Sequence, residues 1–283
     1  MAVRSIAQPC RAACVVVALL AGCAAPAPVT PAAPPAANRQ GHVPEFASKP
    51  YEPFNRADAV AIALREWRLF GQPVDDDPPG TRPRPRPEDK PERMAGLWQR
   101  VGEYWWIGQD ADRPEGAWTG MHDENGVVFP ADQDGYYAWS AAFISYVMRI
   151  AGATSRFPYS PAHHTYINIA KQMSLGQTAG WAVTAERPDA YAPQPGDLIC
   201  AGRGKQAERL RFEDLPTRKG FPAHCAIVVA TGETLSVIGG NVDDAVSLTH
   251  VPTTADGHLA APGDIVVDTR YPWLVVLRVQ YDN

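Results

Sequence analysis

Tyr137-Ala138-Trp139-Ser140-Ala141-Ala142-Phe143-Ile144-Ser145 is a stretch at the start of a helix that the sequence predicts over residues 136–151. Gly152 follows directly and suits a helix C-cap, because glycine adopts left-handed backbone at low cost. A helix N-terminus offers unpaired amide donors and the positive end of the helix dipole. A nucleophile there would lie beside a natural oxyanion site, so Ser140 is the first candidate functional residue.

Further helices are predicted on both sides of this one. Their expected ranges are 54–70, 93–106 and 160 to about 173. Either Asn55 or Asp58 could cap the first of them, which has an amphipathic pattern. Ser160 is expected as the N-cap of the last, with Pro161 as its first residue.

The C-terminal half of the chain changes to segments rich in valine, isoleucine and leucine, which are typical of strands. The predicted strands are 197–201, 223–231, 235–238, 245–249 and 273–281. Gly232-Glu233 suits a tight hairpin between two of them, and a turn is expected at 123–126. Helices first and strands later predict an α+β domain, with the helices packed on an antiparallel sheet.

The N-terminus predicts export and lipid anchoring. An apolar run at residues 12–22 follows two arginines and is too short for a membrane span, which takes about 20 residues. It is typical of a secretory signal, and it ends in Leu20-Ala21-Gly22-Cys23, which resembles the bacterial lipobox. That resemblance implies cleavage before Cys23, acylation of that residue and, with Ala24 next, sorting to the outer membrane. The alternative is an ordinary secretory signal with a chance cysteine.

The predicted organisation is a signal peptide at 1–22, an Ala- and Pro-rich linker at 23–44 and a single domain at 45–283. An exposed loop is expected at 73–91, because proline at that density forbids helix and sheet interiors. The formal charge of −5 becomes −7 when the two arginines of the signal are lost, which argues against a nucleic-acid partner. The expected contact that follows from these features is the membrane, through lipid on Cys23.

Two of the five cysteines lie in the signal and Cys23 is the predicted anchor. Cys200 and Cys225 remain, on predicted neighbouring strands in an oxidising compartment, and a disulfide between them is our hypothesis. The sequence has no CxxC pair and no HExxH stretch, so it predicts no metal site, and it predicts no cofactor.

Three motifs stand in order along the chain. After the stretch around Ser140 comes Pro195-Gly196-Asp197-Leu198-Ile199, a turn into a strand. His224 lies on the next predicted strand, followed by Cys225, which must point to the opposite face because strand side chains alternate. The third motif, Val237-Ile238-Gly239-Gly240-Asn241, is a strand that ends in a polar residue.

This order resembles the papain-like superfamily of bacterial cell-wall amidases and endopeptidases, of the NlpC and CHAP types. The match is nearest to the bacterial domain-of-unknown-function family numbered 2272, which shares the Trp139–Ser145 stretch and a motif like Tyr159-Ser160-Pro161-Ala162-His163. The resemblance covers residues 135–246 and implies a papain-like α+β fold. It also implies Ser140 as nucleophile, His224 as general base and Asn241 as the residue that orients it.

The chain departs from that superfamily at two places. Ser140 stands where the amidases have cysteine, and a hydroxyl, unlike a thiol, must lose its proton during attack. Gly239 stands where CHAP-type enzymes have an acidic residue. Each catalytic candidate also has a structural alternative: Ser140 as a small packing residue, His224 as a core histidine and Asn241 as a turn residue.

The binding candidates are His163, Trp139 and Asp197. His163 is expected in the first turn of its helix, either lining the same cleft or exposed. Trp139 is either a platform for a sugar or a core residue, and Asp197 either contacts a ligand or stabilises its turn.

Two functions follow. One is a lipid-anchored hydrolase that cleaves amide bonds of peptidoglycan through Ser140 and His224. The other is an inactive relative that keeps the cleft to bind peptidoglycan or act as a scaffold. A hydroxyl of Ser140 within about 2.6–3.2 Å of a His224 ring nitrogen favours the hydrolase. A third class, a purely structural envelope protein, would have no cleft.

Overall fold

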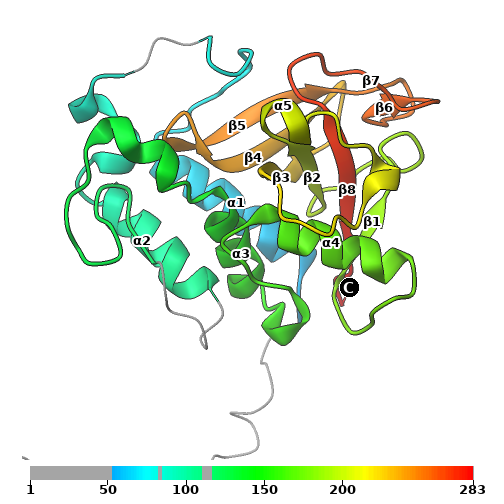
Figure 1. The fold of residues 1–283 in the computed structure, drawn as a ribbon, viewed down its shortest axis with the longest axis horizontal. Helices are drawn as coiled ribbons and strands as arrows, with labels where there is room; N and C mark the ends of the chain where they lie inside the picture. The colour runs from blue at the N-terminus through cyan, green and yellow to red at the C-terminus, as the bar shows by residue number, and fades with distance from the viewer. Residues whose placement is uncertain (1–52, 82–84, 110–116, 283) are drawn as a thin grey trace, which may run out of the picture. The chain divides into compact units, whose positions relative to one another are not determined.

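The computed structural model describes residues 53–81, 85–109 and 117–282, and Figure 1 shows their arrangement. The predicted signal peptide, the linker and Cys23 lie outside the described residues. Within the described part of the chain, no helix has the length and apolarity needed to cross a membrane.

Helices make up most of the N-terminal half, as predicted. The α-helices are α1 Arg56–Leu69, α2 Leu97–Gly108, α3 Ser140–Ile150, α4 His163–Ser174 and the short α5 Gly204–Ala207. Short 3-10 helices are η2 Pro87–Asp89, η3 Pro91–Arg93, η4 Ala131–Tyr136, η5 Thr154–Arg156 and η6 Phe212–Asp214. The side chain of Asn55 caps α1 by accepting from the amides of Ala57 and Asp58, so the first of the two proposed caps is the one used.

All four long helices begin a few residues later than predicted, α1 at Arg56 and α3 at Ser140 among them, and for α2 and α4 the structure shows the local cause. Helix α2 begins at Leu97 because Gly96 has φ 89°, a left-handed conformation that separates the helix from η3. Helix α4 begins at His163, so Ser160 is not its N-cap. The Ser160 hydroxyl instead accepts from the amide of Ala162, which occupies the cap position.

The strands form a six-stranded antiparallel sheet in the order β1-β8-β2-β3-β4-β5. Its members are β1 Val183–Glu186, β2 Leu198–Gly202, β3 Ala223–Ala230, β4 Thr234–Val242, β5 Ala245–Pro252 and β8 Trp273–Val279. A separate hairpin pairs β6 Ala260–Ala261 with β7 Ile265–Val266. The α+β class is therefore confirmed, while β1 was not predicted.

The predicted loop at 73–91 is mostly exposed but is not without structure. Val74 forms an isolated parallel bridge with Leu248 of β5, and η2 and the start of η3 lie within the loop. The predicted turn at 123–126 is present, with the amide of Gly126 donating to the Asp123 carbonyl beneath a bridge between His122 and Val128.

The two faces of the sheet have different neighbours. Helices α1, α3 and α4 pack on one face, against a core that includes Cys225 and Ile227 of β3. Ala226 and Val228 of the same strand belong to a second core on the other face, because strand side chains alternate. This alternation puts His224 on the face away from the helices.

Candidate functional site

Ser140 is the first residue of α3 and is buried, with 6% of the residue exposed. Its hydroxyl lies 2.7 Å from Nε2 of His163, the first residue of α4. The expected partner was His224, so the pairing derived from the motif order is wrong. The two helix N-termini meet here, and the histidine that the sequence offered only as a binding candidate is the one that contacts the serine.

His163 is buried on all sides. Its Nδ1 bonds to the hydroxyl of Tyr166, which lies one helical turn later on α4. Burial lowers the pKa of His163 well below its usual value, and the nearby His224 adds to the effect. Burial also raises the pKa of the Tyr166 phenol well above its usual value. Both side chains are therefore neutral near pH 7.

The tautomer of His163 follows from where the two hydroxyl protons can go. Tyr166 is 0% exposed, and His163 Nδ1 is the one partner of its hydroxyl among the described residues. A buried O–H without an acceptor is costly, so Tyr166 donates to Nδ1. His163 then carries its proton on Nε2 and donates to the Ser140 oxygen, and the hydroxyl proton without an acceptor in the described part of the chain is that of Ser140, which keeps 6% exposure against 0% for Tyr166.

His224 lies on β3, with its ring centroid 5.5 Å from that of His163 and the planes roughly perpendicular. Its Nδ1 is buried and has no hydrogen-bond partner within the described residues. Burial, together with the smaller effect of the charge of Arg203, lowers the pKa of His224 to about 3. Gly239 of β4 makes room for the ring, since a Cβ there would be 2.7 Å from His224 Nε2.

Asn241 does not orient His224, which corrects the third catalytic assignment. Its side-chain amide donates to Oε2 of Glu92 at 3.2 Å. Its φ of 56° is left-handed, which asparagine tolerates, so the turn interpretation of this residue fits its backbone. The three residues that the motif order grouped as a triad thus have three separate sets of partners.

Trp139 and Asp197 are fully buried, and neither offers a surface to a ligand. The Trp139 indole donates to Oε2 of Glu92 at 2.6 Å. The Asp197 carboxylate accepts from the amides of Gln194 and Val279 and from the hydroxyl of Tyr191. Trp139 is therefore a core residue and Asp197 stabilises its turn. The assignment of these two residues to ligand binding is corrected.

Sequence reasoning missed a charged cluster beside Trp139. Carboxylate oxygens of Glu92, Asp134 and Asp244 lie within 4.8 Å of one another, an arrangement that could hold a cation. The cation present is the chain's own: the Lys90 ammonium bonds to Asp134 and lies 3.2 Å from Asp244. Arg93 also bonds to Asp134 at 3.0 Å. No sequence pattern signalled this cluster, because its carboxylates come from η3, η4 and the β4–β5 turn.

Cys200 of β2 and Cys225 of β3 are directly opposite each other in the register and are joined by a disulfide. Both side chains are buried in the core on the helix side of the sheet. His224 and Cys225 point to opposite faces, as strand alternation predicts. Cys225 therefore takes no part in the arrangement around His224.

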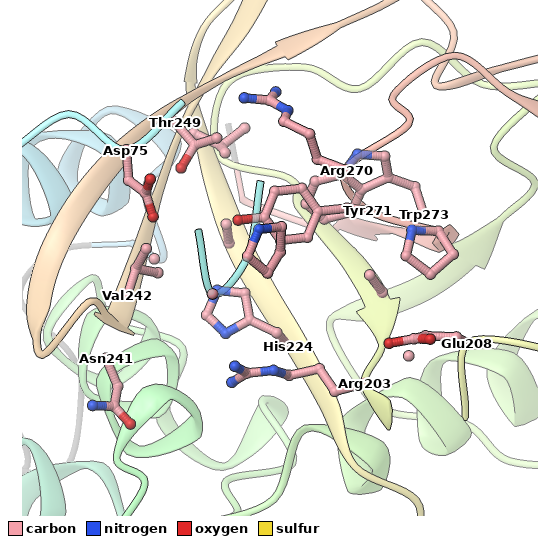
Figure 2. A pocket seen from close by; sticks show the side chains of 18 of the residues that line it. Asp75, Arg203, Glu208, His224, Asn241, Val242, Thr249, Arg270, Tyr271 and Trp273 are labelled. Carbon is pink, nitrogen blue, oxygen red and sulfur yellow. The ribbon is translucent and has the colours of Figure 1, made fainter. Parts of the chain in front are cut away.

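A pocket of about 320 Å³ opens on the face of the sheet away from the helices, and His224 forms part of its wall (Figure 2). Ser140 and His163 are not part of its lining. Charged side chains around it come from Asp75, Arg203, Glu208, Asp243 and Arg270, and aromatic ones from Tyr271 and Trp273. The nucleophile candidate and the pocket are therefore adjacent through the two histidines but distinct.

The chain belongs to a bacterial protein family, DUF2272, whose description reads "Uncharacterized protein conserved in bacteria" and which matches residues 92–279. The matched segment begins within η3, contains Ser140, His163 and His224, and ends at the last residue of β8. No curated protein and no solved structure matches the chain.

Proposed function

We propose that this protein is an exported lipoprotein, anchored through lipid on Cys23, whose domain binds peptidoglycan fragments without cleaving them. The lipobox-like sequence supports the anchor. A cell-wall ligand fits a domain held in the envelope beyond an Ala- and Pro-rich linker.

The domain is papain-like in this proposal, related to the NlpC and CHAP amidases. The support is an antiparallel sheet on which helix α3 packs against β3 and β4, with Ser140 at the helix start and His224 on β3. These are the places where the resemblance puts nucleophile and base. A cysteine is replaced by serine, and the histidine that contacts the serine comes from α4 instead of the sheet.

One observation carries the proposal of binding without turnover: both ring nitrogens of His163 are engaged, Nδ1 by the Tyr166 hydroxyl and Nε2 by the Ser140 hydroxyl. A general base must accept the hydroxyl proton of its nucleophile. Here Nε2 of His163 holds a proton and donates to Ser140, and burial opposes a second proton on the ring. No carboxylate contacts His163 to stabilise the imidazolium, among the residues that the structure describes.

Labelling the purified full chain with a serine-directed fluorophosphonate tests this proposal, with an active serine hydrolase as positive control. We expect no adduct on Ser140, and we expect the same protein to bind soluble fragments from digested peptidoglycan without changing their mass. An adduct on Ser140 that disappears in His163→Ala would instead establish an activated nucleophile.

A serine amidase of the same fold is the second candidate function, and the position of Ser140 favours it. The first helical hydrogen bond of α3 runs from the Phe143 amide to the Trp139 carbonyl, so the preceding amides at the helix start have no helical acceptor. Such donors next to a hydroxyl suit an oxyanion. Release of new amine termini from peptidoglycan by wild type, absent in Ser140→Ala, would select this candidate.

A further inference from the structure

We propose that the pocket beside His224 binds the carboxylate of a small ligand, with the Arg203 guanidinium as its anchor. The inference deepens the proposed function, on which it rests for the source of the ligand: a peptide end from the cell wall. The hydrogen bond between Ser140 and His163 has no part in this site.

The pocket has the size and construction of a small-ligand site. Its volume of about 320 Å³ lies at the lower end of the range of ligand pockets, roughly 300–1,000 Å³. Its floor is formed by small side chains of the sheet, including Ala201, Ala226 and Gly239. Tyr271 and Trp273 stand along one wall in Figure 2, and they offer ring surface to the apolar part of a ligand.

Arg203 is an exposed arginine in the lining of this pocket. Among the described residues, no ion pair or side-chain hydrogen bond engages its guanidinium. The other arginine of the lining, Arg270, bonds to both carboxylate oxygens of Asp268 and to two backbone carbonyls. A free guanidinium in a concave site can bind a carboxylate through two parallel hydrogen bonds.

His224 supplies a second polar group beside that cation. Figure 2 shows its ring next to the Arg203 guanidinium, whose charge is close enough to lower the pKa of the ring. The ring is neutral, and its buried Nδ1 has no partner in the described part of the chain. A buried ring nitrogen without a partner is unfavourable, so in the tautomer with the proton on Nδ1 a carboxylate oxygen that accepts from it would remove a cost already present in the empty domain.

The remaining charges of the lining favour a ligand with a single negative charge over one with two. Asp75, Glu208 and Asp243 are acidic and lie around the same pocket. They would repel a doubly charged phosphate more than a carboxylate with one charge.

The experiment compares two probes that differ only in this charge, acetyl-D-alanyl-D-alanine and its C-terminal amide, by calorimetric titration of the full chain at low salt. We expect the free acid to bind and the amide to bind roughly ten- to hundredfold more weakly. Arg203→Gln should weaken binding of the acid by a similar factor and leave binding of the amide unchanged. Arg209→Gln is the matched control, because Arg209 is exposed and lies outside the lining.

Each result decides one of the two proposals. Equal binding of acid and amide, no effect of Arg203→Gln, or tighter binding of inorganic phosphate overturns the carboxylate site. If peptidoglycan fragments bind under any of these results, the proposed function stands without it. Arg203-dependent binding of the acid with no binding of fragments supports the site and overturns the proposed function. No binding of any probe overturns both.

Discussion

Glu92 is a buried carboxyl group whose two oxygens have unequal surroundings. Oε2 accepts from the Trp139 indole and the Asn241 amide, while Oε1 is buried without a partner within the described residues. Burial raises the pKa of Glu92 to about 8, and the charge of Asp244 adds to the rise. The residue that connects the start of α3 to the end of β4 is therefore protonated near neutral pH.

This shift predicts how stability depends on pH. The folded chain keeps a proton on Glu92 that the unfolded chain releases above its ordinary pKa of about 4.5, so the free energy of unfolding falls as pH rises from about 4.5 to about 8. Glu92→Gln removes this titration. Relative to wild type, the variant should gain on the order of 1–3 kcal/mol between pH 5 and pH 8. Urea unfolding at both pH values measures it; parallel behaviour of the two proteins would contradict it.

At the scale of single residues, the sequence predicted Ser140 as a site residue but not His163 as the residue that contacts it. The motif order singled out Ser140, and the helix begins at that residue. It chose His224 because a strand histidine is the usual base of the resembled superfamily. The choice between His163 and His224 depends on how α4 lies against α3, which no spacing along the chain encodes. Tyr166 and Glu92 were missed because a buried tyrosine or glutamate has no sequence signal of its own.

Strands β2 and β3 are the central pair of the sheet, and a disulfide joins them. Cys200 and Cys225 are register partners, and 25 positions separate them in sequence. A crosslink restricts the unfolded chain, and the effect for loops of this length is about 3 kcal/mol in the chain-entropy account. The same pair of strands carries Arg203 just after β2 and His224 on β3.

Cys200→Ala with Cys225→Ala should lower the free energy of unfolding by about 2–4 kcal/mol, since the unfolded chain regains the freedom that the link removes. Denaturant titration of wild type and the double variant, both without reductant, measures the difference. Mass spectrometry of unreduced wild type is the control. Two free thiols in the exported protein would contradict the link itself.

The periodicity of apolar residues predicted most helices and strands, because the pattern reflects which residues of a single segment are buried. The long helices and the central strands follow from that signal. Strand β1 was missed since Val183-Thr184-Ala185-Glu186 is short and lies at the sheet edge, where burial alternates weakly. The predicted start of α4 at residue 160 is too early, because Ser160-Pro161 has the residues of a cap. The Ser160 hydroxyl instead bonds to the Ala162 amide, and the helix begins after that residue.

The whole molecule brings together segments that are far apart in sequence. The lining of the pocket comes from residue 75, the end of β2, three further strands and residues 270–273. No local pattern joins these positions, so the pocket could not be predicted although most of its strands were. The α+β class, in contrast, depends only on the order of helices and strands.

The membrane anchor is the prediction that concerns the chain as a whole. Cys23→Ser removes the sulfur that the lipobox resemblance assigns to acylation. Cells fed a clickable fatty acid should label wild type and not this variant, as read on the purified protein. Cys14→Ser, in the predicted signal, is the matched control and should label like wild type. Label retained in Cys23→Ser, or a mature N-terminus at another residue, would contradict the anchor.

Lys90 gives Asp134 and Asp244, which lie beside the protonated Glu92, a counter-ion that is part of the polypeptide. A tethered group is present at high effective concentration, and neither dialysis nor a chelator can withdraw it. The export that we propose for this protein would expose the domain to calcium and magnesium at whatever concentration its surroundings supply. Because the ammonium is part of the chain, the contact between the start of α3 and the β4–β5 turn keeps its charge balance at any concentration of calcium or magnesium.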